Sequence, residues 1–235
     1  MISRRNRSKP GRRGLRLLLI AVAIGAVSST YVYQEYVKPQ VVIRKFGVVD
    51  EGRITRSGRM TPATMRKLFR RTHVKTMIDL GMYKTGTPDE IAAQQTADEL
   101  GVTRHRLFLK GDGTGNPNYY VHALRLMTDP DNLPVHIHCN AGAQRTSAAI
   151  ILYRVIVEGR TIPEAYPEAF NYGHHPRKDW ILLYYVTKWL EPIRAAYASG
   201  GWIEGYDIPE DAIEMGYEPP QSDDGADGVV TTPAP

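Results

Sequence analysis

The sequence contains one cysteine, Cys139, among 235 residues. A single thiol cannot form an internal disulfide, so a disulfide framework is excluded. Apolar residues make up 42% of the chain, which suits the hydrophobic core of one ordinary domain with appendages. Internal repeats are also missing, which argues against a solenoid or propeller.

Each end of the chain lacks charge of one sign. Residues 1–16 contain seven basic side chains and no acid, whereas residues 201–235 contain nine acids and no base. The part between them is basic overall, which favours anionic substrates. It lacks a dense basic and aromatic stripe, so we do not expect nucleic acid as a partner.

The basic N-terminus is followed by residues 17–27, an apolar run without charge. From residue 17 to residue 37 the only charged side chain is Glu35, and tyrosines at positions 31, 33 and 36 suit a membrane interface. We therefore expect residues 1–37 to form a basic N-terminus and a membrane segment, with the membrane contacted through residues 15–37. A single-pass anchor with a cytoplasmic N-terminus would place the remaining chain on the far side.

A cleaved signal peptide is the alternative reading of the same segment. The apolar run has the length of a signal-peptide core, and residues 26–28 offer a small-x-small cleavage site. Cleavage there would export the domain instead of anchoring it.

Residues 38–199 alternate between strand and helix signals. Helices are expected from the Thr61–Pro62 start, at 87–100, 116–128, 146–158 and 176–198; strands are expected at 41–46, 52–56, 74–80, 102–109 and 134–138. Capping boxes are predicted at Thr87–Glu90 and Thr161–Glu164. This order predicts an α/β domain with a central, mostly parallel sheet flanked by helices. Residues 200–235 form an acidic tail, in which Trp202, Ile203 and Tyr206 are expected to pack back on the domain and residues 219–235 to be disordered.

Cys139 lies between a predicted strand and a predicted helix. Backbone N–H groups of such a loop and the helix N-terminus favour both a thiolate and a bound phosphate. Arg145 can present a planar fork to two phosphate oxygens, and the Thr146 hydroxyl can hydrogen-bond the sulfur when it leaves. We expect His138 to orient the loop. The expected phosphate-binding positions are Asn140, Ala141, Gly142, Ala143, Gln144 and Arg145.

This stretch resembles the Cys-x5-Arg-Ser/Thr signature of the cysteine-dependent protein tyrosine and dual-specificity phosphatases. The sequences at 46–49, 54–58 and 74–80 are similar to the opening of compact dual-specificity-like members, and the resemblance covers residues 40–195. It implies hydrolysis of phosphate monoesters through a phosphocysteine, with neither metal nor cofactor.

The resemblance also implies an aspartate general acid on a separate loop, roughly thirty residues before the cysteine. Asp112, in a glycine-rich loop 27 residues upstream, is the candidate. The Trp-Pro-Asp motif of the tyrosine phosphatases is absent here. Asp129 and Asp131 are alternatives, but both lie in the turn before the catalytic strand.

Less specific readings compete with this one. Cys139 could be a small buried apolar side chain. A zinc site is disfavoured because His136 and His138 share one strand face and Cys139 points to the other. His174 and His175 are expected as a surface pair, or else at the pocket rim with Arg177 and Lys178, and Arg154 is expected to be structural.

The expected function is therefore that of a membrane-associated phosphatase. Its default partner is a phosphorylated protein bearing phosphotyrosine, with phosphoserine or phosphothreonine also considered, or a small phosphate ester. An inositol-phosphate or phosphoinositide phosphatase is the alternative, although the uncharged residues 140–144 weaken it. A catalytically silent phosphate-binding module is the reading from another class.

Overall fold

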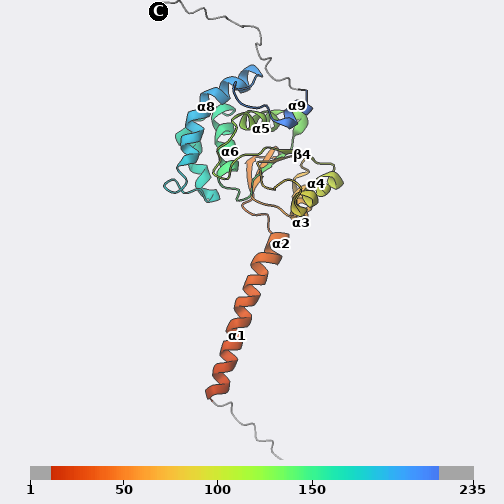
Figure 1. Ribbon diagram of the computed structural model, residues 1–235, viewed down its shortest axis with the longest axis vertical. Coiled ribbons are helices and arrows are strands. Elements are labelled where there is room, and N and C mark those ends of the chain that lie inside the picture. The colour runs from red at the N-terminus through yellow and green to blue at the C-terminus, as the bar shows by residue number, and fades with distance from the viewer. Residues whose placement is uncertain (1–11, 217–235) are drawn as a thin grey trace, which may run out of the picture.

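The computed structural model describes residues 12–216, and a long helix carries the folded domain (Figure 1). Helix α1 (Arg12–Val32) continues through the π-helical turn η1 (Tyr33–Val37) into α2 (Lys38–Val41). Side chains of residues 14–38 are all exposed. The helix is apolar and long enough over Gly14–Val41 to cross a membrane. The predicted disorder of residues 219–235 lies outside the described residues.

A five-stranded sheet forms the centre of the domain, in the order β1-β2-β5-β3-β4. The strands are β1 (Gly47–Asp50), β2 (Ile54–Ser57), β3 (Thr76–Asp79), β4 (Thr103–Arg106) and β5 (Val135–His138). Only the β1–β2 pair is antiparallel; β5 runs parallel to both of its neighbours. The predicted mostly parallel sheet is confirmed, and its parallel strands direct their carboxyl ends to the same edge.

Helices cover both faces of this sheet (Figure 1). One face is covered by α5 (Asn118–Thr128) and α6 (Gln144–Ile156), with α8 (Ile181–Ser199) packed against both helices, and the larger core cluster lies there. The other face packs against α3 (Pro62–Thr72) and α4 (Pro88–Leu100), where a smaller cluster lies. The short elements are η2 (Pro130–Asn132), α7 (Ile162–Ala165), η3 (Tyr166–Tyr172) and α9 (Glu210–Glu214).

The predicted strand at residues 41–46 is wrong. Val41 ends α2, and the first strand begins only at Gly47. Ile43 is buried in the smaller core cluster between exposed neighbours, which produces an alternating pattern without a strand. Lys45 has φ = 51°, a left-handed conformation that no extended strand contains.

The two predicted capping boxes have different outcomes. Glu164 accepts a hydrogen bond from the Thr161 backbone N–H at 2.8 Å, as predicted. The Thr87 side chain makes no such cap; Glu90 instead accepts from Arg104 at 3.1 Å. A tertiary ion pair has therefore replaced the local bond.

The start of the acidic tail packs on the domain. Trp202 and Ile203 contact the larger core cluster, and the Tyr206 ring lies 5.1 Å from that of Trp189, as expected. The last long helix begins at Ile181, later than predicted, after a turn at residues 176–180.

Candidate active site

The Cys139 loop connects the carboxyl end of β5 to the N-terminus of α6. We call residues 139–145 the catalytic loop. Cys139 is 1% exposed, and the Gly142 backbone N–H donates to its Sγ at 3.2 Å. The sulfur therefore sits inside a turn whose amide already points at it, as the sequence predicts for an anion site.

Gly142 allows the loop to pack closely on the chain behind it. Its φ is +65°, and a Cβ at this position would lie 2.7 Å from the Gly58 nitrogen. Just after β2, the Arg59 N–H donates to the Asn140 carbonyl at 2.9 Å. The segment after β2 thus supports the catalytic loop from the side opposite its helix.

Arg56, at the end of β2, braces the loop from within the core. Its side chain is fully buried, and Nη2 donates to the Gly142 carbonyl at 3.0 Å and to Ser147 Oγ at 2.9 Å. Its guanidinium carbon lies 3.6 Å from the centre of the Tyr172 ring. Burial lowers the pKa of Arg56 to about 10, so the group stays charged at neutral pH.

Sequence reasoning did not identify Arg56 as a site residue. Its position in the 54–58 sequence is part of the family resemblance, and that was the available signal. Its contact with Gly142 spans 86 residues, so periodicity and spacing could not reveal it.

Arg145 is the second residue of α6, and its guanidinium is held by backbone carbonyls. Its Nη1 donates to the carbonyl oxygens of Leu80, at 2.8 Å, and Gly81. Its Nε is buried and has no hydrogen-bond partner among the described residues. One corner of the guanidinium is therefore fixed to the backbone after β3, which leaves Nε available for a phosphate oxygen.

The other predicted phosphate-binding positions follow Cys139 along the loop and differ in exposure. Asn140 is exposed, Ala141 and Gln144 are half-buried, and Gly142 and Ala143 are buried. Thr146, within the first turn of α6, is fully buried, and its hydroxyl has no hydrogen-bond partner among the described residues. The predicted bond from Thr146 to the sulfur is not formed here and stays a prediction for the reacting state.

His138 precedes the cysteine and is buried against a second histidine. Its ring stacks on that of His136 with centroids 5.8 Å apart, and His136 in turn bonds Thr55 and Ser57. Burial, with the nearby charges of Arg104 and Arg145, lowers the pKa of His138 to about 3. A histidine that is neutral at physiological pH cannot donate a proton as an imidazolium, which agrees with an orienting role.

Asp112 lies in the loop of residues 110–117, which we call the acid loop. Gly113 of this loop lies against the catalytic loop, because a Cβ there would be 3.5 Å from the Gln144 carbonyl carbon. The exposed Asp112 carboxylate accepts from the Thr114 N–H at 2.9 Å and from its hydroxyl at 2.7 Å. Partial burial acts to raise the pKa of Asp112, but the bonds from Thr114 outweigh it and lower the pKa.

The alternative acids lie at the wrong end of the sheet. Asp129 accepts from the Asp131 N–H at 2.9 Å and caps η2, just before the amino end of β5. Cys139 follows the carboxyl end of the same strand. The structure therefore brings Asp112, and neither alternative, to the loop edge that holds the sulfur.

His174 is a site residue rather than a surface one. The expectation of an exposed His174–His175 pair is wrong, because His174 is 2% exposed while His175 is exposed. Its Nδ1 lies 2.8 Å from Gln144 Oε1 and its Nε2 lies 2.7 Å from the Tyr166 hydroxyl. The segment after η3 thus fixes the last variable position of the catalytic loop.

Two other expectations concern residues around this site. Arg154 is structural as expected, since it bonds the Val49 carbonyl, Glu158 and Glu168. Among residues 12–216, no group of three or more histidine, cysteine, aspartate or glutamate side chains could hold a metal ion.

Solved structures of cysteine-dependent phosphatases share this fold. The core catalytic domain of the PP-IP phosphatase Siw14 from S. cerevisiae is 18% identical, with a TM-score of 0.54; the match covers 68% of this chain and 95% of that one. TpbA from P. aeruginosa is 20% identical, with a TM-score of 0.52 and coverage of 65% and 96%. PTPMT1 is 16% identical, with a TM-score of 0.52 and coverage of 66% and 99%.

The domain therefore has the fold of the protein tyrosine and dual-specificity phosphatases, as the sequence resemblance predicts. No family model and no curated protein matches the chain. At these identities the likeness concerns the fold, and the chemistry must be argued from the residues of the site.

Proposed function

We propose that this protein hydrolyses phosphate monoesters through a phosphocysteine intermediate. The observation that carries the proposal is the catalytic loop itself. The only thiol of the chain accepts a backbone N–H from Gly142, and Arg145, six residues further on, has an Nε without a partner among residues 12–216. A preorganised set of donors of this kind stabilises the charge of a transferring phosphoryl group.

In the first step the Cys139 sulfur attacks phosphorus, an S–P bond forms and the P–O bond to the leaving group breaks. Asp112 gives its proton to the leaving oxygen, for which its carboxyl group must turn away from Thr114. In the second step water attacks phosphorus, Asp112 takes the proton of that water and the thiolate leaves with phosphate released. The Thr146 hydroxyl, which has no partner in the described part of the chain, would then donate to the departing sulfur.

Activity toward p-nitrophenyl phosphate tests this proposal directly. Wild-type protein should turn over with vanadate-sensitive kinetics, and Cys139→Ser should reduce the rate to background, since the hydroxyl is a far weaker nucleophile. A wild-type rate no greater than that of Cys139→Ser would establish the alternative, a phosphate-binding module without catalysis.

The substrate class is open between two kinds of monoester. TpbA has been solved in complex with phosphotyrosine, and PTPMT1 in complex with PI(5)P. These neighbours support protein phosphotyrosine and a phosphoinositide as candidates for this chain. The variable loop positions 140–144 carry no charge, which argues against substrates with many phosphates.

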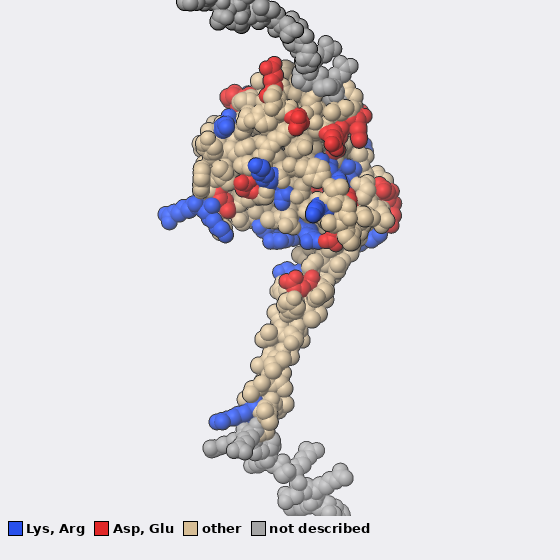
Figure 2. Space-filling view, in the orientation of Figure 1, with Lys and Arg blue, Asp and Glu red and all other residues tan. Residues whose placement is uncertain are grey.

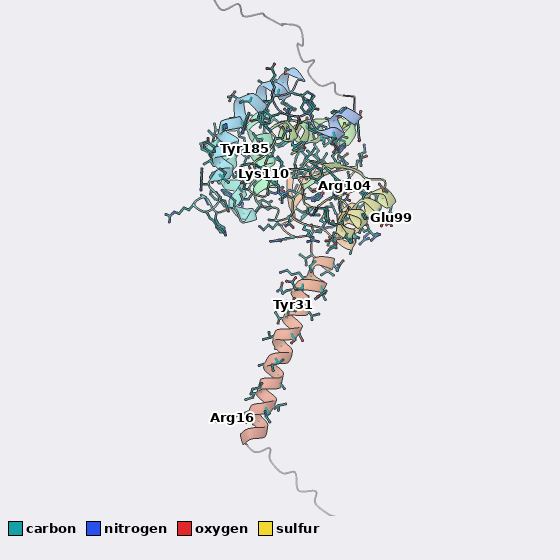
Figure 3. The ribbon with its side chains drawn as sticks, in the orientation of Figure 1. Arg16, Tyr31, Glu99, Arg104, Lys110 and Tyr185 are labelled. Carbon is teal, nitrogen blue, oxygen red and sulfur yellow. The ribbon has the colours of Figure 1, made fainter. Side chains whose placement is uncertain are left out.

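We further propose that α1 anchors the protein in a membrane by a single pass. Arg16 and Tyr31 lie toward opposite ends of the apolar stretch (Figure 3). The basic residues before α1 favour a cytoplasmic N-terminus and a catalytic domain on the far side. Protease added outside intact cells should then degrade the domain; full protection with an intact α1 would reverse the orientation.

A further inference from the structure

A cavity of about 920 Å³ lies between the end of the long helix and the adjoining part of the domain. Its volume lies within the range of about 300–1,000 Å³ that small-molecule sites occupy. The lining side chains come from the helix end, from the linker to β1, from the segments after β2 and β5, and from the start of α4. Those that matter most are Glu35, Lys38, Arg44, Lys45, Arg59 and Asn140.

The cavity adjoins the catalytic loop. Asn140 directly follows Cys139, and the Arg59 backbone that supports Asn140 contributes a side chain to the same cavity. Cys139 and the Lys45 ammonium also interact electrostatically. That interaction acts to raise the pKa of Lys45, while burial, the largest effect, lowers it.

The helix places the cavity at the surface of a membrane. Residues 17–34 contain no charged side chain, and at 1.5 Å per residue they extend over about 27 Å, close to the hydrocarbon thickness of roughly 30 Å. Arg16 and Glu35 bound this stretch. Gln34 and Glu35 also line the cavity. The side of the cavity formed by η1 and α2 therefore begins where the hydrocarbon of the bilayer ends.

Contacts between the helix end and α3 fix which way the cavity faces. Thr61 Oγ1 donates to the Pro39 carbonyl at 3.2 Å, and Lys67 Nζ donates to the Val41 carbonyl at 2.7 Å. Basic side chains gather on the face of the domain where the helix joins it, and many of the acids lie toward the opposite end (Figure 2). The face nearest the helix is therefore suited to an anionic surface.

The charge inside the cavity favours an anionic occupant. Its lining has four basic side chains, Lys38, Arg44, Lys45 and Arg59, against the two acids Glu35 and Asp89. Arg59 pairs with Asp89, so the surplus charge is carried by the side chains on the helix and linker.

From these observations we infer that the cavity receives the headgroup of a phospholipid bearing a phosphate monoester, with its acyl chains remaining in the bilayer beside α1. This inference rests on the proposed phosphatase function and names its substrate class. The headgroup alcohol stays on the lipid when its P–O bond breaks, and the phosphoryl group passes to Cys139 and then to water. A folded protein would instead have to enter between the domain and the bilayer to reach a cavity that is lined by Glu35.

The test uses the full chain reconstituted in phosphatidylcholine vesicles. A phosphatidylinositol monophosphate in the same vesicles is compared with its free inositol phosphate headgroup and with a phosphotyrosine peptide, both in solution. We expect kcat/KM for the lipid to exceed both others by about tenfold or more, because enzyme and lipid share one surface and a high effective concentration. The free headgroup distinguishes recognition of the phosphate ester alone from recognition of the membrane lipid.

Charge substitutions then locate the site. Lys38→Gln combined with Arg44→Gln should lower the ratio of lipid to p-nitrophenyl phosphate activity about fivefold or more, since phosphate contacts are charge-dependent. Arg194→Gln is the matched control, because Arg194 lies on α8 and pairs with Glu191; it should leave the ratio unchanged.

The outcomes separate the two proposals. Turnover of p-nitrophenyl phosphate without a lipid preference, or with a preference for the peptide, overturns the lipid inference and leaves the phosphatase function intact. An unchanged ratio in the double variant overturns the cavity as the site. Absence of any turnover dependent on Cys139 overturns both proposals.

Discussion

The catalytic loop and the acid loop differ in how they are held. The catalytic loop is buried, and contacts from β2, from the chain after β3 and from the segment after η3 fix its backbone and side chains. In the acid loop, long-range bonds reach the Gly115 carbonyl, from the Tyr185 hydroxyl, and Asn116, which donates to the Asp207 carbonyl. The exposed Asp112 carboxylate, by contrast, accepts its bonds from the neighbouring Thr114. The phosphate-binding groups are thus fixed by tertiary contacts, whereas Asp112 is held by local turn bonds.

This difference matches the two tasks. A phosphate cradle acts best when its donors are oriented before the substrate arrives, because no reorganisation is then needed during reaction. A proton donor must approach a leaving group that changes with the substrate, so a carboxylate bonded by a neighbouring residue suits the proposed role of Asp112. Variants can test whether each loop behaves accordingly.

Arg145→Lys should have the largest effect. Lysine cannot bond the Leu80 and Gly81 carbonyls and also offer a planar fork to phosphate. We expect kcat/KM for p-nitrophenyl phosphate to fall by about 10²- to 10³-fold, the usual effect of losing one oriented donor. A loss below tenfold in a variant with wild-type thermal stability would show that phosphate binding by the catalytic loop does not depend on the planar guanidinium of Arg145.

Asp112→Asn should have a strong effect that depends on the leaving group. Asparagine keeps the shape but cannot give a proton, so an alkyl phosphate should lose about 10²-fold in kcat and p-nitrophenyl phosphate much less. Parallel kinetics with the two esters measure the contrast. Equal losses for both would remove Asp112 from the acid role, and Asp131→Asn serves as the unaffected control.

Arg56→Met should reduce both stability and activity. The change leaves the Gly142 carbonyl and Ser147 Oγ without their donor, which costs about 1–3 kcal/mol in urea unfolding and about tenfold in kcat. Arg154→Met is the matched control, because Arg154 is also buried but does not contact the catalytic loop. The Arg154 variant should lose comparable stability while each folded molecule keeps its activity. An Arg56 variant with full kcat would contradict the role of Arg56 in holding the catalytic loop.

Thr114→Val should have the smallest effect, a change in pH dependence. In the proposed mechanism Asp112 gives up a proton in the first step, so activity should fall as pH rises through its pKa, and the Thr114 hydroxyl lowers that pKa. Valine removes the hydroxyl, so the descending limb of kcat/KM should move to higher pH with little change at the optimum. Thr72→Val is the control. A descending limb that moves to lower pH or stays in place in the Thr114 variant would refute the effect of the Thr114 hydroxyl on the pKa of Asp112.

The sequence predicted those parts of the site that depend on local order. A buried strand, a loop with small residues and a helix were all recognisable around Cys139, and Asp112 was predicted as the acid from its distance along the chain, a role that stays a prediction. The structure places both at the same edge of the sheet. Arg56 was not recognisable, because it reaches the catalytic loop across 86 residues; His174, which reaches it across 30, was considered only as the alternative at the pocket rim.

The errors in the sequence predictions have the same origin. The strand predicted at 41–46 came from an alternating pattern that arises because Ile43 alone is buried. The capping box predicted at Thr87–Glu90 is not formed, because Glu90 pairs with Arg104 of another element. In each case a tertiary contact overrode a local preference, and a single sequence contains no signal for such contacts.

The single cysteine has a practical consequence for measuring this enzyme. Since Cys139 is the only thiol in the chain, titration of the denatured protein with a thiol reagent counts intact active sites one for one. Oxidation or alkylation at any other residue leaves that count unchanged. The titre would convert a bulk rate into turnover per competent molecule, and a preparation with half its thiol lost should show half its specific activity.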